Sequence, residues 1–216
     1  MKTVLLATVI SGLTASTSVL AAGEFEGPWV GAGMGFRGQN TKVTDNNTGQ
    51  EVDGLGKNSI FGVLQGGYAW RYGDWNIGPY GFYLIGTTTS DVVTPNNGGF
   101  FNGTTSFEMK WKNQWGIGFQ PGYYLSDDTI MYLKMSYNRT KAELTVNTPS
   151  GSLNPSENFG GPGIGLGMKH ELSNHVILFV DAQQQYYSSK TFNVAGQSIE
   201  VKPKMTMGMF GIGYQF

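Results

Sequence analysis

The chain ends with the run Phe210-Gly211-Ile212-Gly213-Tyr214-Gln215-Phe216, which has an aromatic or aliphatic side chain at every second position. Glycine and glutamine fill the positions between them. Successive side chains of a β-strand point to opposite faces. The run therefore predicts a strand with one apolar face and one small or polar face.

A second run with this alternation extends from Phe107 to Gly122. Its odd positions are mostly apolar (Phe107, Met109, Trp111, Trp115, Ile117 and Phe119), and its even positions are charged, polar or glycine. A half-buried strand of a soluble sheet shows the same pattern, but usually over about five or six residues. A tilted membrane strand needs roughly nine to eleven. Because the run is longer than both, we predict a transmembrane strand.

The N-terminus has the order of a secretory signal peptide. Lys2 precedes an apolar stretch from Val4 to Ile10, and Val19-Leu20-Ala21-Ala22 ends the segment in small residues. Serine, threonine and glycine interrupt the apolar run well before the ~20 residues of a membrane helix, which disfavours that alternative. We predict a signal peptide over residues 1–22, cleaved after Ala21 or Ala22, and a single barrel domain over residues 23–216.

Composition excludes several functions. The chain has no cysteine, so it has no disulfide, no thiolate nucleophile and no acylated cysteine of a lipoprotein. A net charge of -1 with 13% charged residues argues against nucleic-acid binding and against disorder. Only 39% of the residues are hydrophobic, as expected when alternate residues of each strand face lipid. We expect neither a cofactor nor a metal.

Alternation and turn residues together predict an eight-stranded antiparallel up-and-down barrel. The expected strands are Pro28 to Arg37, Ser59 to Tyr72, Trp75 to Thr87, Thr105 to Tyr124, Thr129 to Glu143, Gly160 to Leu172, His175 to Tyr187 and Lys202 to Phe216. Short turns alternate with four long connections, over residues 38–58, 88–104, 144–159 and 188–201. This is the pattern of short periplasmic turns and long extracellular loops, and an even strand count leaves both termini in the periplasm.

The interior of so narrow a barrel is filled by side chains. Alternate glycines (Gly31, Gly33, Gly35, Gly163, Gly165 and Gly167) make room there. The polar side chains expected inside are Arg37, Gln65, Glu108, Lys110, Lys112, Lys134, Ser136, Asp181, Gln183 and Gln185. Buried charges need partners, so we predict that Glu108 or Asp181 pairs with Arg37 or a lysine. An aromatic girdle is expected at the periplasmic ends, from Trp29, Trp70, Tyr72, Trp75, Tyr80, Tyr123, Tyr124, Tyr214 and Phe216.

The opening strand Gly27-Pro28-Trp29-Val30-Gly31-Ala32-Gly33-Met34-Gly35 and the closing run resemble small bacterial outer-membrane barrels of the OmpA-like transmembrane-domain or opacity-protein type. This resemblance implies an outer-membrane location and a surface of lipid and lipopolysaccharide. It also implies that the barrel assembly machinery recognises the terminal strand through Phe210, Ile212, Tyr214 and Phe216. No peptidoglycan-binding domain follows the closing strand, so that anchoring role is not expected. A soluble lipocalin-like barrel is disfavoured because its interior would be apolar.

Three functions are compatible with this sequence. The first is a monomeric structural or surface-interaction barrel, adhesin-like, with a plugged lumen and a ligand held by the long loops. Apolar loop residues (Phe100, Phe101, Phe107, Leu153 and Phe192) are candidate contacts with such a ligand. The alternative is that they pack against each other or dip into lipopolysaccharide. The second is a low-conductance pore lined by Lys110, Lys112 and Lys134. The third is a lipid A-modifying enzyme using His170, Glu171, Ser173 and His175, which is disfavoured because residues at one periplasmic turn rarely converge as a triad.

Overall fold

The computed structural model describes residues 25–46, 49, 51–55, 57–92, 106–148, 151–173, 175–194 and 197–216. The predicted signal peptide lies outside these residues. Within the described part of the chain, no helix is long and apolar enough to cross a membrane.

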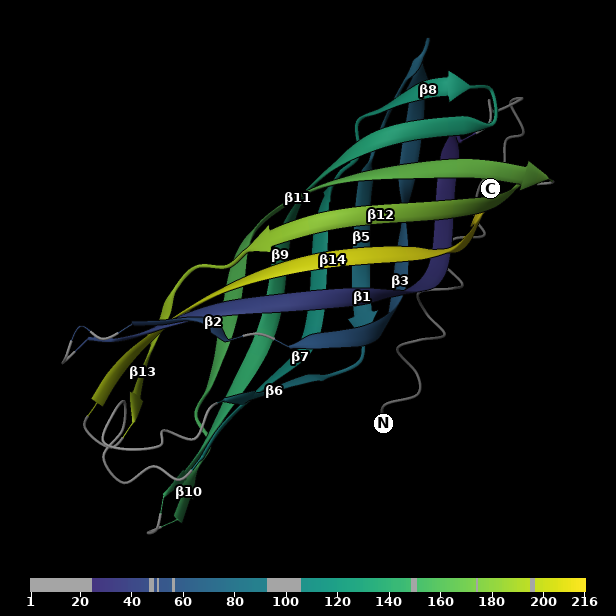
Figure 1. Cartoon of the computed structure of the whole chain (residues 1–216). Coiled ribbons are helices and arrows are strands. Elements are labelled where there is room, and N and C mark those ends of the chain that lie inside the picture. Colours follow the sequence, from purple (N-terminus) through teal and green to yellow (C-terminus); the bar gives the residue numbers. More distant parts are fainter. Residues whose placement is uncertain are drawn as a thin grey trace, which may run out of the picture.

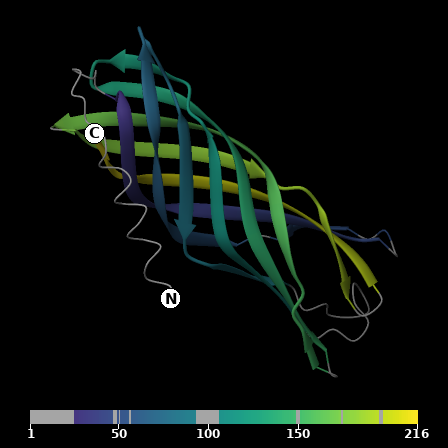
Figure 2. The same ribbon diagram turned by 180° about the vertical axis from the view of Figure 1, so that it is seen from behind.

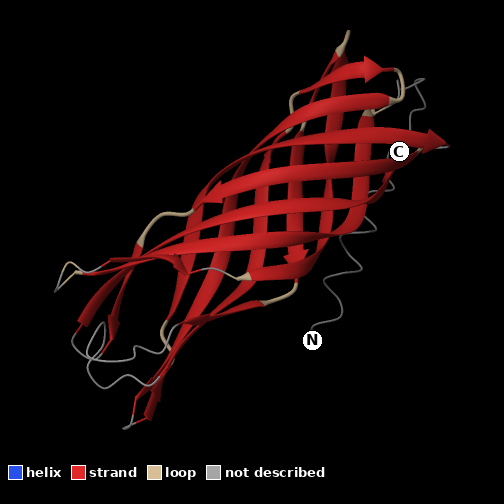
Figure 3. Cartoon of the chain, viewed as in Figure 1, coloured by secondary structure: helices blue, strands red, loops and turns tan. Residues whose placement is uncertain are grey.

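The described residues form strands joined in one antiparallel sheet (Figure 3). The strands are β1 (Gly27–Asp45), β2 (Glu51–Leu55), β3 (Asn58–Tyr72), β4 (Trp75–Ile77), β5 (Pro79–Ile85), β6 (Thr88–Val92), β7 (Ser106–Phe119), β8 (Gly122–Ser126), β9 (Thr129–Thr148), β10 (Gly151–Leu153), β11 (Ser156–Ser173), β12 (Val176–Tyr186), β13 (Lys190–Val194) and β14 (Gln197–Gln215).

The long strands close the sheet into a ring. Pairing runs from β1 through β3, β5, β7, β9, β11, β12 and β14, and returns to β1. Trp29 of β1 therefore lies opposite Gly67 of β3 on one side and Gln215 of β14 on the other. The front and back of this ring appear in Figures 1 and 2. Closure pairs both edges of the sheet, so the first and last strands protect each other.

Short strands lengthen the two ends of the ring differently. At the end that holds the C-terminus, where Figure 1 shows β8, this strand pairs with β4. At the opposite end, β2, β6, β10 and β13 pair with β1, β7, β9 and β14. The predicted strand limits at this end were wrong: β1 continues beyond Arg37, β9 continues beyond Glu143, and β14 begins before Lys202. The reason is that the long connections fold back as β-hairpins, whose partners extend the neighbouring strands.

The outward side chains of the long strands form an apolar belt around the ring. Its exposed members include Val30, Met34, Phe36, Ile60, Leu64, Tyr83, Trp115, Ile117, Phe119, Met131, Met135, Tyr137, Ile164, Leu166, Val180, Phe210 and Ile212. A continuous band of exposed apolar side chains is the surface that a transmembrane barrel presents to lipid.

The strands continue past this belt at the end that carries the hairpins. There the polarity of the outward and inward faces is reversed. Outward side chains become charged, as at Arg139 and Lys204. Inward side chains become apolar, and buried examples are Met109, Trp111, Ala142, Leu144, Phe159, Phe192, Ile199, Val201 and Met205. We call this part the apolar extension, because it is packed like the core of a water-soluble β-protein.

A β-bulge in β7 changes which of its residues face the interior. Between Lys112 and Trp115 the register with β9 shifts, and Asn113 adopts a φ of 51°. One extra residue in a strand exchanges the faces of all residues beyond it. Trp111 is therefore buried inside while Trp115 is exposed outside. The assignment of Glu108, Lys110 and Lys112 to the interior was wrong, because all three lie beyond the bulge and face outward.

The predicted aromatic girdle also needs correction. Trp70, Tyr72, Trp75, Tyr123, Tyr214 and Phe216 are exposed, as a girdle requires. Trp29, Tyr80 and Tyr124 are instead buried. Tyr80 alternates in register with Phe82 and Leu84, which face the interior, and so cannot face lipid on the same strand.

Candidate functional site: the interior polar network

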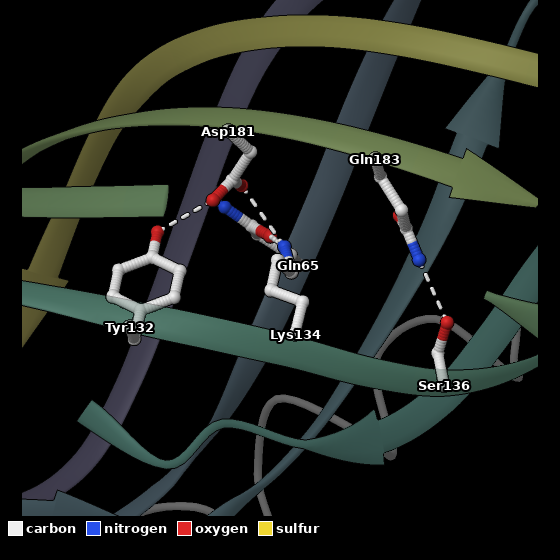
Figure 4. A network of polar contacts seen from close by, with 6 residues as sticks. All are labelled: Gln65, Tyr132, Lys134, Ser136, Asp181 and Gln183. Carbon is white, nitrogen blue, oxygen red and sulfur yellow. Dashed lines mark hydrogen bonds and ion pairs between the residues drawn. The ribbon is translucent and has the colours of Figure 1, made fainter. Parts of the chain in front are cut away.

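A buried ion pair lies in the membrane-level interior. Lys134 Nζ of β9 is 2.9 Å from Asp181 Oδ2 of β12, and the two side chains are 1% and 0% exposed. Tyr132 donates a hydrogen bond of 2.6 Å to the other carboxylate oxygen, and Lys134 donates one of 3.0 Å to Gln65 Oε1 (Figure 4). Ions removed from water are tolerated when such partners surround them. The predicted pairing of Asp181 with Lys134 is therefore present.

These contacts cross the ring instead of running along its wall. Gln65 lies on β3, which is separated from β9 by β5 and β7. On the next level, Gln183 donates a hydrogen bond of 2.7 Å to Ser136, also visible in Figure 4. Gln65, Ser136, Gln183 and the ion pair thus occupy the lumen where the sequence predicted them.

A second layer spans the interior nearer the apolar extension. Arg37 of β1 donates hydrogen bonds to Ser59 at 2.9 Å and to Gln114 of β7 at 3.1 Å. Gln114 in turn donates to Tyr187 at 2.9 Å and to Gln185 of β12. Among the described residues, Arg37 has no carboxylate partner. The sequence correctly placed Arg37 inside, but its partners are amides and hydroxyls.

Lys169 is an interior cation that the sequence prediction missed. It is buried, and its Nζ lies 3.5 Å from the centre of the Trp29 ring and 5.4 Å from that of Tyr132. An ammonium group over an aromatic face is stabilised by the negative face of the ring. The signal is in the sequence: Lys169 continues the alternation of Gly163, Gly165 and Gly167, which predicts an interior position for it. Trp29 itself is inside because it shares the face of Gly31, Gly33 and Gly35 on its strand.

The outward lysines of β7 belong to a different surface. Lys112 forms an ion pair with Glu143, and Lys141 lies 3.6 Å from the same carboxylate. The hydrogen bond from Lys112 and the nearby positive charges hold the pKa of Glu143, which lies beyond the apolar belt, below its usual value. Lys110 lies opposite Glu143 in the β7–β9 register, and Glu108 is exposed. These residues line no part of the lumen.

The closing strand presents Phe210, Ile212, Tyr214 and Phe216 outward, each exposed. It pairs with β1 and β12, and the backbone N–H of Phe216 donates to the carbonyl of Pro28 at 2.9 Å. Gln215 points inward and donates to the carbonyls of Glu26 and Pro28. The start of β1 and the end of β14 are therefore held together. Recognition of this strand by assembly machinery stays a prediction.

The residues considered for catalysis do not converge. His170 Nδ1 is within hydrogen-bond distance of the Thr129 hydroxyl at 2.9 Å. The ring of His175 packs on Tyr214, and its backbone N–H donates to Glu171 at 3.1 Å. Ser173 is exposed and makes no side-chain hydrogen bond to either histidine. In the described residues there is also no group of three or more histidine or acidic side chains arranged for a metal ion.

The candidate loop contacts have a mixed outcome. Phe100 and Phe101 lie outside the described residues, as do the side chains of Phe107 and Leu153. Phe192 was wrongly predicted to be available to a partner. It is buried in the apolar extension, where its ring centre lies 6.2 Å from that of Phe159.

Comparisons with known proteins agree with this architecture. The sequence profile of the family described as outer membrane protein beta-barrel domain matches residues 5–216. A search of curated proteins found no match. Solved structures with similar folds include the outer membrane protein OprG of Pseudomonas aeruginosa, at 14% identity and a TM-score of 0.57, covering 90% of this chain and 98% of OprG.

Two further structures are similar in fold. The outer membrane protease OmpT of Escherichia coli is 9% identical with a TM-score of 0.54, covering 93% of this chain and 100% of OmpT. The outer membrane protein AlkL is 16% identical with a TM-score of 0.53, covering 93% of this chain and 95% of AlkL. At these identities the similarity concerns the fold alone.

Proposed function

Since this chain belongs to the outer membrane protein beta-barrel domain family, we propose that it is a non-conducting scaffold that holds its hairpin loops at the cell surface. The protein is located in the bacterial outer membrane. Its ring of β1, β3, β5, β7, β9, β11, β12 and β14 is an eight-stranded barrel in this proposal. The role is structural or adhesin-like, without chemistry.

One observation carries the proposal: interior side chains bridge strands that are three places apart in the ring, across the space between them. Arg37 of β1 reaches Gln114 of β7, and Lys134 of β9 reaches Gln65 of β3. Such bridges are hydrogen-bonded and buried, so an ion crossing the barrel would have to break them at a cost of about 1–3 kcal/mol for each bond left unmade.

The apolar extension supports the surface role. We place the end with β2, β6, β10 and β13 outside the cell, since long connections of bacterial barrels are extracellular. There, Trp111, Phe159 and Phe192 form a packed core beneath the hairpins. A rigid support of this kind positions binding loops.

Planar-bilayer recordings of the refolded protein test the proposal. We expect no reproducible current from the wild type, and small currents from the double variant Lys134→Ala/Asp181→Ala, which removes the central bridge. The matched control is Lys110→Ala/Lys112→Ala, which alters outward lysines and should stay silent. A steady wild-type current from demonstrably folded protein would refute a closed lumen.

The second candidate is a low-conductance pore, and one observation favours it. Arg37, Lys134 and Lys169 are buried in the interior together with the single carboxylate of Asp181, as far as the described side chains show. An excess of positive charge favours anions. If the barrel conducts, its current should be anion-selective, and Lys134→Gln should reduce that selectivity whereas Lys112→Gln should not. Catalysis is not proposed, because His170, Ser173 and His175 make separate contacts.

A further inference from the structure

The lipid-facing surface of β3, β5, β7 and β9 carries an apolar groove of about 860 Å³. Its lining includes Gly66 and Gly81, which are paired across β3 and β5 and have no side chain to fill the surface. Exposed side chains of Ile117, Phe119 and Tyr137 stand beside them. The groove is therefore a hollow within the apolar belt.

Cations gather next to this groove on the side of the hairpin end. Tyr137 lines the groove, and Arg139 follows two residues later on the same face of β9, about 7 Å further along the strand. Arg139 pairs in register with Trp115, and Lys141 pairs with Lys112. Arg139 is exposed and forms no ion pair with any described side chain.

The bulge at Asn113 assembles this cluster. It turns Glu108, Lys110 and Lys112 to the outer face, where the two lysines join Arg139 and Lys141. Glu143 neutralises part of this charge through Lys112 and Lys141. Bulges often redirect side chains in this way. The result is a basic cluster at one end of an apolar groove.

We propose that this face binds a phosphorylated acyl lipid of the outer leaflet, lipid A, with an acyl chain in the groove and a phosphate at Arg139, Lys112 and Lys141. The proposal rests on the orientation given under the proposed function, since the cations must lie at the level of the outer headgroups. Arginine and lysine bind phosphate through charge-assisted hydrogen bonds. A groove that continues from such a cluster matches an amphiphile with an anionic head and an apolar tail.

Charge favours this occupant over a second copy of the chain. A two-fold symmetric contact through the groove would use the same patch on both molecules. It would bring the two Arg139 side chains toward each other, and like charges across an interface are unfavourable. A phosphorylated lipid instead supplies the missing negative charge.

Native mass spectrometry of the refolded protein in lipid-free detergent micelles, titrated with bisphosphorylated lipid A, tests the proposal. Orientation plays no part in micelles, so this readout is independent of the conductance test above. We expect one bound lipid. Dephosphorylated lipid A should bind at least roughly tenfold more weakly, since loss of one charge-assisted hydrogen bond lowers the affinity by about a factor of ten. Inorganic phosphate should not compete at equal concentration, because it lacks the chain that fills the groove.

Two pairs of variants separate the groove from the cluster. Arg139→Gln/Lys141→Gln should weaken binding about tenfold or more, whereas Lys202→Gln/Lys204→Gln on β14 should not. Gly81→Leu should fill the groove and reduce binding, because an added Cβ at Gly81 meets its neighbours only at 3.6 Å and beyond. Its control is Gly208→Leu on β14, where an added Cβ meets nothing within 4 Å. Folding of each variant is checked by circular dichroism and heat-modified gel mobility.

Equal affinity in all four variants would overturn the site, as would equal binding of the dephosphorylated lipid. A protein dimer that Gly81→Leu abolishes, in place of a lipid adduct, would assign the groove to a second copy. Lipid binding together with a wild-type current would retain this site and reject the closed lumen.

Discussion

Replacing Asp181 by asparagine should destabilise the folded barrel by about 3–5 kcal/mol, the usual cost of removing one partner of a buried ion pair. The side chain of Lys134 is 1% exposed, and its ammonium group has only Gln65 as its other hydrogen-bond partner among the described residues. Its charge would remain in a place that water does not reach. Tyr132 would also exchange a charged acceptor for a neutral one.

The double variant Asp181→Asn/Lys134→Met should recover most of this loss. Methionine removes the unpaired charge and keeps a long apolar side chain near the ring of Tyr80, which lies 4.7 Å from Lys134 Nζ. A buried ion pair and an apolar substitute are often similar in stability. The two single substitutions should therefore be strongly non-additive.

Equilibrium unfolding in urea, with the protein in phospholipid vesicles and tryptophan fluorescence as the probe, measures these differences. The exposed pair Lys42–Glu51 is the control: its N–O distance is 2.8 Å, but its side chains are 42% and 52% exposed, and Glu51→Gln should cost at most about 1 kcal/mol. An Asp181→Asn cost as small as that of the control, or an additive double variant, would refute the reasoning.

Three other outcomes are expected. Asn113→Val should destabilise the barrel by about 1–2 kcal/mol in the same unfolding assay, because a β-branched residue is strained at a φ of 51°. Asn113→Gly should be nearly neutral. Equal effects of the two substitutions would argue against a left-handed conformation at the bulge. Phe159→Ala should leave a cavity between Trp111 and Phe192 that lowers the free energy of unfolding by about 3–5 kcal/mol. It should also expose β13 to protease while the membrane-level strands stay protected. Unchanged cleavage would contradict the packing of the apolar extension. Hydrogen bonds from Ser126 and Thr129 hold the pKa of the Asp128 carboxyl below its usual value. These hydrogen bonds therefore stabilise the fold above the pKa that Asp128 has in the unfolded chain, and the stabilisation is lost as pH falls through its lower pKa in the folded protein. An NMR titration should show this low midpoint, and Ser126→Ala should raise it; a midpoint that does not move would remove Ser126 as the cause.

Period-two alternation was sufficient for the class of fold and for much of the lumen. Arg37, Gln65, Lys134, Asp181 and Gln183 lie inside as expected, because each belongs to a stretch whose neighbours alternate without interruption. Where alternation is regular, a residue's face follows from its position alone. The same rule places Lys169 inside, because Lys169 continues the alternation past Gly167.

The strand from Phe107 to Gly122 shows where that rule fails. Its letters alternate throughout, with Trp111 and Trp115 in equivalent positions, yet the bulge at Asn113 puts one inside and the other outside. A bulge depends on register with the neighbouring strands, which a single sequence does not record. The burial of Phe192 is similar, since its partner Phe159 lies on another strand.

The sequence by itself determined that this chain forms an antiparallel transmembrane sheet with an apolar outer belt, because that information is local to each strand. Only the tertiary structure decided which cations meet which carboxylate, and that Lys112, Arg139 and Lys141 gather outside above a groove. Those arrangements depend on strand register and ring closure, which bring together residues far apart in the chain, such as Arg37 and Gln114.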